Sequence, residues 1–197
     1  MKARSHLMPA MLVVMFLLVH PAWAEQVDCQ QCHKKLTAGS VVHAAVQMGC
    51  ENCHTGVDAS AIPHKFAGRL GLSAESPGLC FQCHAKGAFT KKVQHAPISA
   101  SKCLICHTPH SGPYESLLKA KGNALCRQCH EEIEKKRHPA TARQGHALEG
   151  PSDPVRKGRP FGCISCHVPH SSDWGKLFRF NAPNASGLCK YCHDFLQ

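Results

Sequence analysis

All fourteen cysteines belong to one repeated pattern, and this pattern constrains the fold more than any other feature of the 197-residue chain. Each pair of cysteines encloses two residues and is followed at once by a histidine, and no cysteine is left over. The seven copies are Cys29, Cys32 and His33; Cys50, Cys53 and His54; Cys80, Cys83 and His84; Cys103, Cys106 and His107; Cys126, Cys129 and His130; Cys163, Cys166 and His167; and Cys189, Cys192 and His193. Two thiols at this spacing reach the two vinyl groups of one haem, and the adjacent histidine becomes the proximal iron ligand. The sequence therefore predicts seven covalently bound haem c groups.

Zinc sites and disulfides are the alternatives for a cysteine-rich chain. A structural zinc ion takes four ligands, so seven pairs would leave one pair without a partner. Neither zinc nor a secreted disulfide scaffold requires histidine at the very next position. Both alternatives fit the pattern poorly.

The histidines outside the motifs match the motifs in number. The chain has 16 histidines, of which His6 and His20 lie in the predicted signal peptide described below and seven belong to the motifs. The remaining seven are His43, His64, His95, His110, His138, His146 and His170. We expect these seven to be distal ligands, which gives every iron two histidines. Met48 is the only methionine beyond the predicted signal peptide, so His/Met ligation cannot be general.

Two of these histidines cannot serve the nearest motif. His110 and His170 each stand three residues after a proximal histidine, His107 and His167, and cannot reach the opposite face of the same haem. Each is therefore predicted to serve a haem held by another motif, which would draw haems together. By elimination alone, the lone first motif at His33 is matched with His138.

The N-terminus reads as a secretory signal peptide over residues 1–24. Lys2 and Arg4 precede an apolar run over residues 8–19, and Ala22-Trp23-Ala24 is a small-x-small cleavage signal. A retained N-terminal anchor is the alternative, but the run is short for a membrane span. We expect export to the periplasm, with an extracellular or outer-membrane association as a further possibility.

Three internal repeats follow the first motif. Each unit consists of a histidine and two motifs, and the units cover about residues 43–84, 95–130 and 146–193. The lone motif at 29–33 precedes them, so residues 25–197 are expected to form one seven-haem domain. Units two and three share the sequence Cys-His-x-Pro-His-Ser, which unit one lacks.

This pattern resembles the doubled CXXCH motif of multihaem cytochromes c. The resemblance rests on His95-Ala-Pro97, 103–111 and 125–130, and nearly as well on 163–171 and 188–193. It implies a chain of bis-histidine haems that transfers electrons in the periplasm or at the outer surface, often in anaerobic respiration or metal reduction.

The expected fold is a set of short helices and loops wrapped around a haem core, with little or no β-sheet. Only 8 Phe, 2 Trp and 2 Tyr are present, which is thin material for a core of side chains. We expect helices over 125–136 and, shorter, over 116–121, and a loop over 151–160, which holds three prolines. Haem-free protein is expected to be unfolded.

The charge and the ligand count favour an electron carrier over an enzyme or a nucleic-acid binder. Without the predicted signal peptide, 21 basic and 13 acidic residues give a net charge of +8, and two propionates on each haem, about −14 in all, would offset it. Two histidines on every iron leave no open position for a substrate, and low potentials are expected without methionine ligands.

Expected partners are redox proteins: an inner-membrane quinol-oxidising complex, a terminal reductase or an outer-membrane cytochrome. We expect no nucleic acid and no stable membrane insertion.

Three alternatives remain open. A multihaem reductase would need one open iron, and the chain has no CxxCK variant. A filament subunit or an outer-membrane conduit would share ligands between chains, whereas the match of seven and seven favours a monomer.

Overall fold

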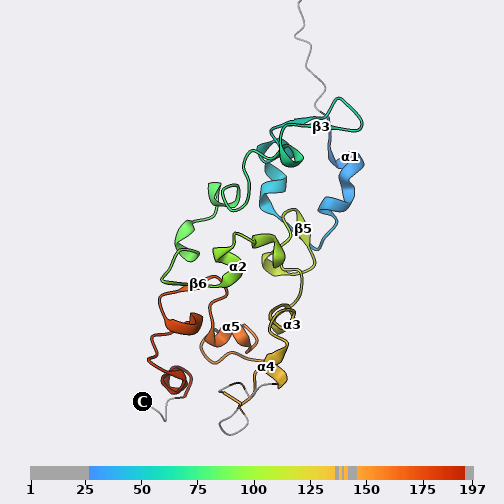
Figure 1. Ribbon diagram of the computed structural model, residues 1–197. Helices are drawn as coiled ribbons and strands as arrows, with labels where there is room; N and C mark the ends of the chain where they lie inside the picture. Colours follow the sequence, from blue (N-terminus) through green and yellow to red (C-terminus); the bar gives the residue numbers. More distant parts are fainter. Residues whose placement is uncertain (1–26, 136–137, 139, 142–145, 194–197) are drawn as a thin grey trace, which may run out of the picture.

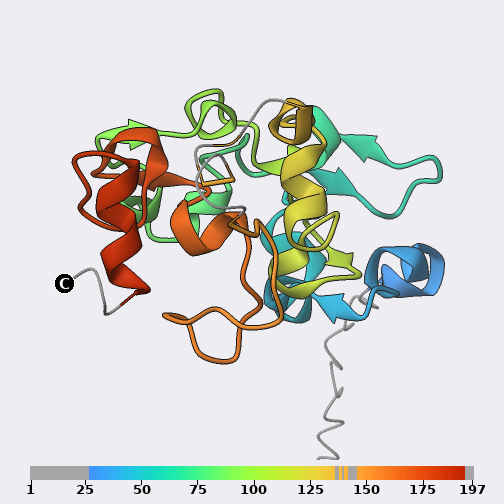
Figure 2. The same ribbon diagram turned by 90° about the horizontal axis from the view of Figure 1, so that it is seen from below.

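The computed structural model describes residues 27–135, 138, 140–141 and 146–193. The predicted signal peptide and the last residue of the helix expected over 125–136 lie outside these residues. The chain is drawn out along one direction, with the N-terminal segments at one end and the C-terminal segments at the other (Figure 1). Seen along that direction, α1 and the C-terminal segment lie on opposite sides (Figure 2).

The helices are short. The α-helices are α1 (Gln30–His33), α2 (Ala96–Ser99), α3 (Asn123–Arg127), α4 (Glu132–Lys135) and α5 (Cys163–Cys166). The 3-10 helices are η1 (Lys34–Thr37), η2 (Ala44–Met48), η3 (Cys50–Asn52), η4 (Arg69–Gly71), η5 (Cys80–Gln82), η6 (Lys86–Ala88), η7 (Cys103–Ile105), η8 (Glu115–Leu117), η9 (Gly175–Leu177) and η10 (Ala185–Tyr191). No helix in the described ranges is long and apolar enough to cross a membrane.

Two helix predictions need correction. The single helix expected over 125–136 is instead two pieces, α3 and α4, within the described residues. The helix expected over 116–121 is wrong, because Ser116 and Leu117 have φ values of 56°, in the left-handed region, and the chain extends after Leu117. The loop over 151–160 is confirmed.

The strands are two residues long and form three antiparallel pairs. The pairs are β1 (Val41–Val42) with β5 (Ser111–Gly112), β2 (Val57–Asp58) with β3 (Lys65–Phe66), and β4 (Val93–Gln94) with β6 (Ser171–Ser172). The β2–β3 pair is a local hairpin, whereas the other two join distant parts of the chain. Short helices, loops and this small amount of sheet confirm the expected fold class.

The polypeptide has almost no core of its own. Among the described residues, Phe178 is the only buried hydrophobic side chain, and large apolar side chains such as Met48 (65% exposed) and Ile62 (87% exposed) face outward or into open space. A chain that buries so little apolar surface lacks the main driving force for folding. The arrangement fits a protein whose interior is filled by apolar cofactors.

Candidate haem-binding sites

Every Cys-x-x-Cys-His motif forms one closed helical turn. In all seven, the histidine N–H donates to the carbonyl of the first cysteine, at 2.9–3.1 Å. The turn brings positions i, i+3 and i+4 to one side of the backbone, so both thiols and the imidazole lie on the same side of the turn. All fourteen cysteines are free thiols, as covalent attachment of haem requires.

Each motif histidine lies opposite one histidine from outside the motifs. The seven ring pairs have centroid separations of 5.9–6.4 Å and use each of the fourteen histidines once. The pairs are His33 with His64, His84 with His43, His54 with His110, His130 with His95, His107 with His170, His167 with His138, and His193 with His146.

The spacing of the rings fits a metal ion between them. Metal–imidazole bonds are about 2.0–2.1 Å long at zinc sites, so an ion bound by two opposed imidazoles sets their centres roughly 6 Å apart. Two protein ligands are too few for structural zinc, but they complete a haem iron whose other four positions belong to the porphyrin. In the described part of the chain no three His, Cys, Asp or Glu side chains converge as a metal-ion site would need. The donor set therefore fits haem.

The pairing expected by elimination is wrong. His33 lies beside His64, and His138 lies beside His167. The elimination argument failed because it treated the lone first motif as separate from unit one, whereas the β2–β3 hairpin turns His64 back toward it. His110 and His170 do face motifs other than their own, at His54 and His107.

The first motif histidine of each unit has the same kind of backbone partner. His54, His107 and His167 donate from Nδ1 to the carbonyls of Leu70, Ser116 and Lys176, at 2.8–2.9 Å. Each partner has φ of 54–56°, a strained value for these residues. A proton on Nδ1 leaves the Nε2 lone pair free for a metal.

The junction between units one and two is built around a distal histidine. His43 donates from its backbone N–H to the carbonyl of His110 at 2.8 Å and lies 2.8 Å through Nδ1 from the carbonyl of Pro109. Ser111 Oγ donates to the Leu36 carbonyl at 2.8 Å. The His-Ser of the repeated motif thus fastens one unit to the next.

The junction between units two and three repeats this arrangement. His95 donates its backbone N–H to the carbonyl of His170 at 2.9 Å, and its Nδ1 lies 3.0 Å from the carbonyl of Pro169. Ser171 Oγ donates to the Ala88 carbonyl at 2.8 Å and accepts from the N–H of Lys91 at 3.2 Å. The two junctions are structural copies of each other.

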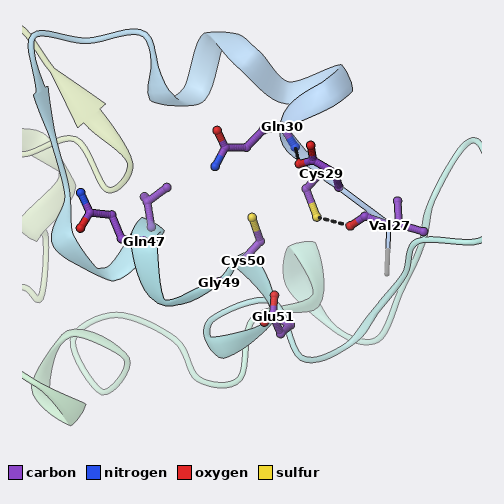
Figure 3. A pocket seen from close by; sticks show the side chains of 9 residues that line it. Val27, Cys29, Gln30, Gln47, Gly49, Cys50 and Glu51 are labelled. Carbon is purple, nitrogen blue, oxygen red and sulfur yellow. Dashed lines mark hydrogen bonds between the residues drawn. The ribbon is translucent and has the colours of Figure 1, made fainter. Parts of the chain in front are cut away.

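Cysteines of successive motifs lie close together. Cys29 and Cys50 point into one cavity of about 390 Å³ (Figure 3). Burial, together with the Cys29 thiol, raises the pKa of Cys50. A hydrogen bond from the Cys126 thiol lowers the pKa of Cys163 to about 7. The first motif therefore lies against the second, and the fifth lies against the sixth.

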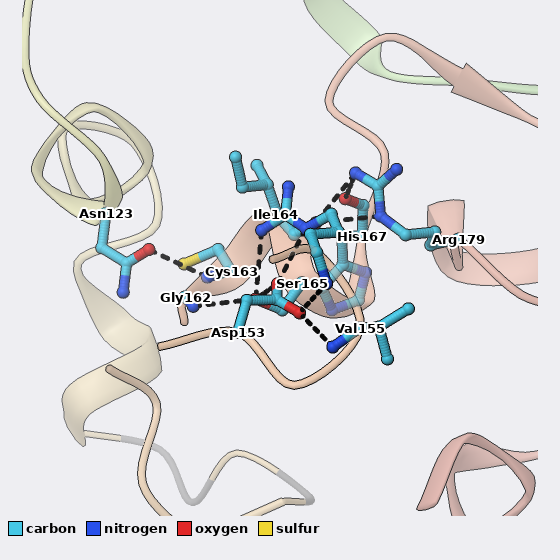
Figure 4. A network of polar contacts seen from close by, with 10 residues as sticks. Asn123, Asp153, Val155, Gly162, Cys163, Ile164, Ser165, His167 and Arg179 are labelled. Atoms are coloured by element: carbon cyan, nitrogen blue, oxygen red, sulfur yellow. Dashed lines mark hydrogen bonds and ion pairs between the residues drawn. The ribbon is translucent and has the colours of Figure 1, made fainter. Parts of the chain in front are cut away.

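A buried carboxylate holds the sixth motif in place. Asp153, 2% exposed, accepts hydrogen bonds from Ser165 Oγ at 2.6 Å and from the backbone and side chain of Arg156 at 2.8 and 2.7 Å (Figure 4). Burial opposes its ionisation, but these hydrogen bonds outweigh burial and lower the pKa of Asp153. On the other side of α5, the N–H of Cys163 donates to Asn123 Oδ1 at 2.9 Å.

Three of the histidines outside the motifs have lowered pKa values. Burial, and then the neighbouring histidines, lower the pKa values of His110, His138 and His170. A neutral imidazole is the form that binds a metal.

Sequence reasoning missed the residues that support the motifs. Asp153 was placed only within a loop, although Asp followed by Pro is a turn signal. Leu70, Ser116 and Lys176 act through backbone carbonyls, so their side chains carry no chemical signature. These three residues share only their position: each directly precedes a Gly or Leu that also has positive φ.

Comparison with protein families places the chain. The doubled CXXCH motif family matches residues 43–89, 95–135 and 153–197, which together make up more than half of the sequence. The chain belongs to the doubled CXXCH motif family. It is therefore a multihaem c-type cytochrome, and electron transfer is the function this class indicates. No curated protein matches it.

Proposed function

We propose that this cytochrome carries seven haem c groups, each with two histidine ligands, and relays electrons outside the cytoplasm. The observation that carries the proposal is the one-to-one pairing of all fourteen histidines at 5.9–6.4 Å. Haem c, when bound, supplies a reversible one-electron couple. In each pair the motif histidine is the proximal ligand, and the histidine from outside the motifs is the distal ligand.

The polypeptide prepares these ligands by fixing their tautomer. Distal His43, His64 and His95 have Nδ1 within 2.8–3.0 Å of a backbone carbonyl, so the proton sits on Nδ1. Such partners orient the ring and make Nε2 more basic. Bis-histidine ligation without methionine favours low reduction potentials, as respiratory electron traffic at the reducing end requires.

The order of contacts supports a relay along the chain. Cys29 and Cys50 link the first two sites, and Cys126 and Cys163 link the fifth and sixth. Between the second and third sites, the two distal histidines are joined by the backbone hydrogen bond from His43 to His110. The polypeptide itself thus holds these neighbouring sites together.

The setting follows from the same proposal. We place the protein in the periplasm of an anaerobically respiring bacterium, exported by the predicted signal peptide. Its partners would be an electron-donating quinol-oxidising complex of the inner membrane and an accepting terminal reductase or outer-membrane cytochrome. Self-sufficient ligand pairs favour a monomer.

Haem content tests the proposal directly. The protein, expressed with a cytochrome c maturation system, is measured by intact mass and by the pyridine haemochrome spectrum. We expect seven haems per chain, and six in the Cys29→Ser/Cys32→Ser double variant. Fewer than seven in the unchanged protein, or zinc in place of haem, would contradict the proposal. Sizing chromatography of the same sample checks the monomer.

A further inference from the structure

The repeat follows a pairing rule that fails at one site. The histidine after the first motif of a unit pairs with the motif histidine one unit earlier. This rule gives the pairs of His64 with His33, His110 with His54, and His170 with His107. His167 does not follow the rule, because its partner is His138, which precedes its own motif in the sequence.

His138 differs in origin from the partners that follow the rule. It comes from the segment between units two and three, and its ring lies 6.4 Å from that of His167. His167 itself is held like its counterparts, through Nδ1 to the carbonyl of Lys176 at 2.9 Å. The departure from the rule therefore concerns only the distal side of this site.

The hydrogen bonding of His138 is reversed relative to four of the other histidines outside the motifs. His43, His64, His95 and His146 each have Nδ1 within 2.7–3.0 Å of a backbone carbonyl. Nδ1 of His138 instead accepts the backbone N–H of Ala140 at 3.3 Å. A neutral imidazole that accepts at Nδ1 carries its proton on Nε2.

This tautomer opposes metal binding. A protonated Nε2 has no lone pair for iron, and Nδ1 already accepts from Ala140. To act as a ligand, His138 must give up the Ala140 contact and move its proton, which the other four histidines need not do. Loss of a supporting partner typically weakens metal affinity by about 10–100-fold.

The crossing angle of the rings does not explain the difference. The rings of His138 and His167 cross at 85°, and those of His146 and His193 cross at 86°. Yet Nδ1 of His146 lies 2.7 Å from the carbonyl of Ala147. His146 is therefore a matched control: it has the same ring geometry but the opposite hydrogen bonding.

From the broken rule and the reversed hydrogen bond we propose that the site of Cys163, Cys166 and His167 exchanges its distal ligand. His138 occupies the position until a small neutral diatomic molecule displaces it, so that one site of the relay also binds such a ligand. This inference rests on the proposed bis-histidine function and adds a binding activity to it.

Carbon monoxide is the probe. The seven-haem protein is reduced with dithionite and titrated with carbon monoxide, and bound ligand is counted from the Soret change and the C–O stretching band. We expect one carbon monoxide per chain in the unchanged protein. His138→Ala also binds one, with an affinity higher by about 10–100-fold because no histidine has to leave. His146→Ala binds two.

A further variant tests whether the hydrogen bond from Ala140 to His138 controls carbon monoxide binding, or whether an accessible site is enough. Ala140→Pro removes the N–H that Nδ1 of His138 accepts, so His138 becomes a firmer ligand. We expect carbon monoxide affinity to fall by about 10-fold or more, with the haem count unchanged.

The outcomes separate the two proposals. No binding in the unchanged protein, or two molecules per chain in His138→Ala, would overturn the exchangeable site while leaving the bis-histidine relay intact. Binding to three or more haems of the unchanged protein would overturn the relay, and the inference with it.

Discussion

The two unit junctions and the last unit of this cytochrome use the same motif with different results. At both junctions a Pro-His-Ser segment fastens one unit to the next and supplies a distal ring to the preceding unit. In the five histidine pairs whose motif histidine lies outside the last unit, the ring planes are 14–42° apart. The two pairs of the last unit are crossed at 85–86°.

This contrast shows that ring geometry comes from contacts between units more than from the motif itself. All seven motifs form the same turn, yet the ring arrangement of the last unit differs from that of the other two. In the last unit, the partner of His167 comes from the segment between units two and three, and the partner of His193 comes from unit three itself.

The largest effect is expected from removing a haem at a junction. Cys103→Ser/Cys106→Ser empties the site of His107 and His170, which joins units two and three. With so few buried side chains, we expect a loss of more than about 4–5 kcal/mol in the free energy of unfolding. Cys29→Ser/Cys32→Ser, at the end of the chain, should cost clearly less. Denaturation of both purified variants measures this, and equal losses would remove the distinction between middle and end.

The junction serines come next. Ser171→Ala leaves the Ala88 carbonyl and the Lys91 N–H without their partner at a residue that is 1% exposed, so we expect a loss of about 1–3 kcal/mol. Ser111→Ala, at the less buried junction, should cost less. Ser99→Ala, an exposed serine near β4, is the control and should stay within about 0.5 kcal/mol. Chemical denaturation of the oxidised protein gives all three values; a Ser171→Ala loss no larger than the control's would show that the junction does not depend on this hydroxyl.

The third prediction concerns the contribution of Asp153 to the stability of the last unit. Its pKa is lowered in the folded state, so its contribution to stability is present above the unfolded value of about 3.9 and is lost as the pH falls below it. Asp153→Asn should cost about 1–3 kcal/mol at pH 7 and flatten the decline in stability between about pH 4 and pH 2. Urea denaturation across this range tests it. A variant with the same pH dependence as the unchanged protein would assign the decline to other carboxylates.

The smallest effect is expected at the strained residues whose carbonyls accept from the motif histidines. Ser116 and Lys176 have φ of 56° and 54°, which glycine adopts without strain. The histidine donates this hydrogen bond to a backbone carbonyl. Ser116→Gly and Lys176→Gly should therefore keep it and change the free energy of unfolding by no more than about 1 kcal/mol. Unchanged reduction potentials in a spectroelectrochemical titration would confirm that only the carbonyl matters. A shifted potential would assign a role to the side chain.

The sequence was sufficient for the chemistry of the motifs and for the sparse fold. The spacing of Cys and His is local, and each motif closes its own turn without help from the rest of the chain. The shortage of aromatic residues correctly indicated a weak side-chain core, since Phe178 alone is buried among the described hydrophobic residues.

The pairing of histidines was beyond the sequence because it depends on how units stack. His64 lies beside His33 at the turn of the β2–β3 hairpin, and His138 lies beside His167 although His170 is nearer in the sequence. The helix expected over 116–121 failed for a related reason: Ser116 is held in a left-handed conformation that points its carbonyl at His107. Tertiary demands of the site override local helix propensity there.

A low-temperature EPR spectrum of the fully oxidised protein, with spins counted per chain, tests the central claim most directly. The account predicts seven low-spin ferric haems per chain, because a histidine stands on each side of every site. A chain with fewer than seven haems, or with several high-spin irons, would contradict it.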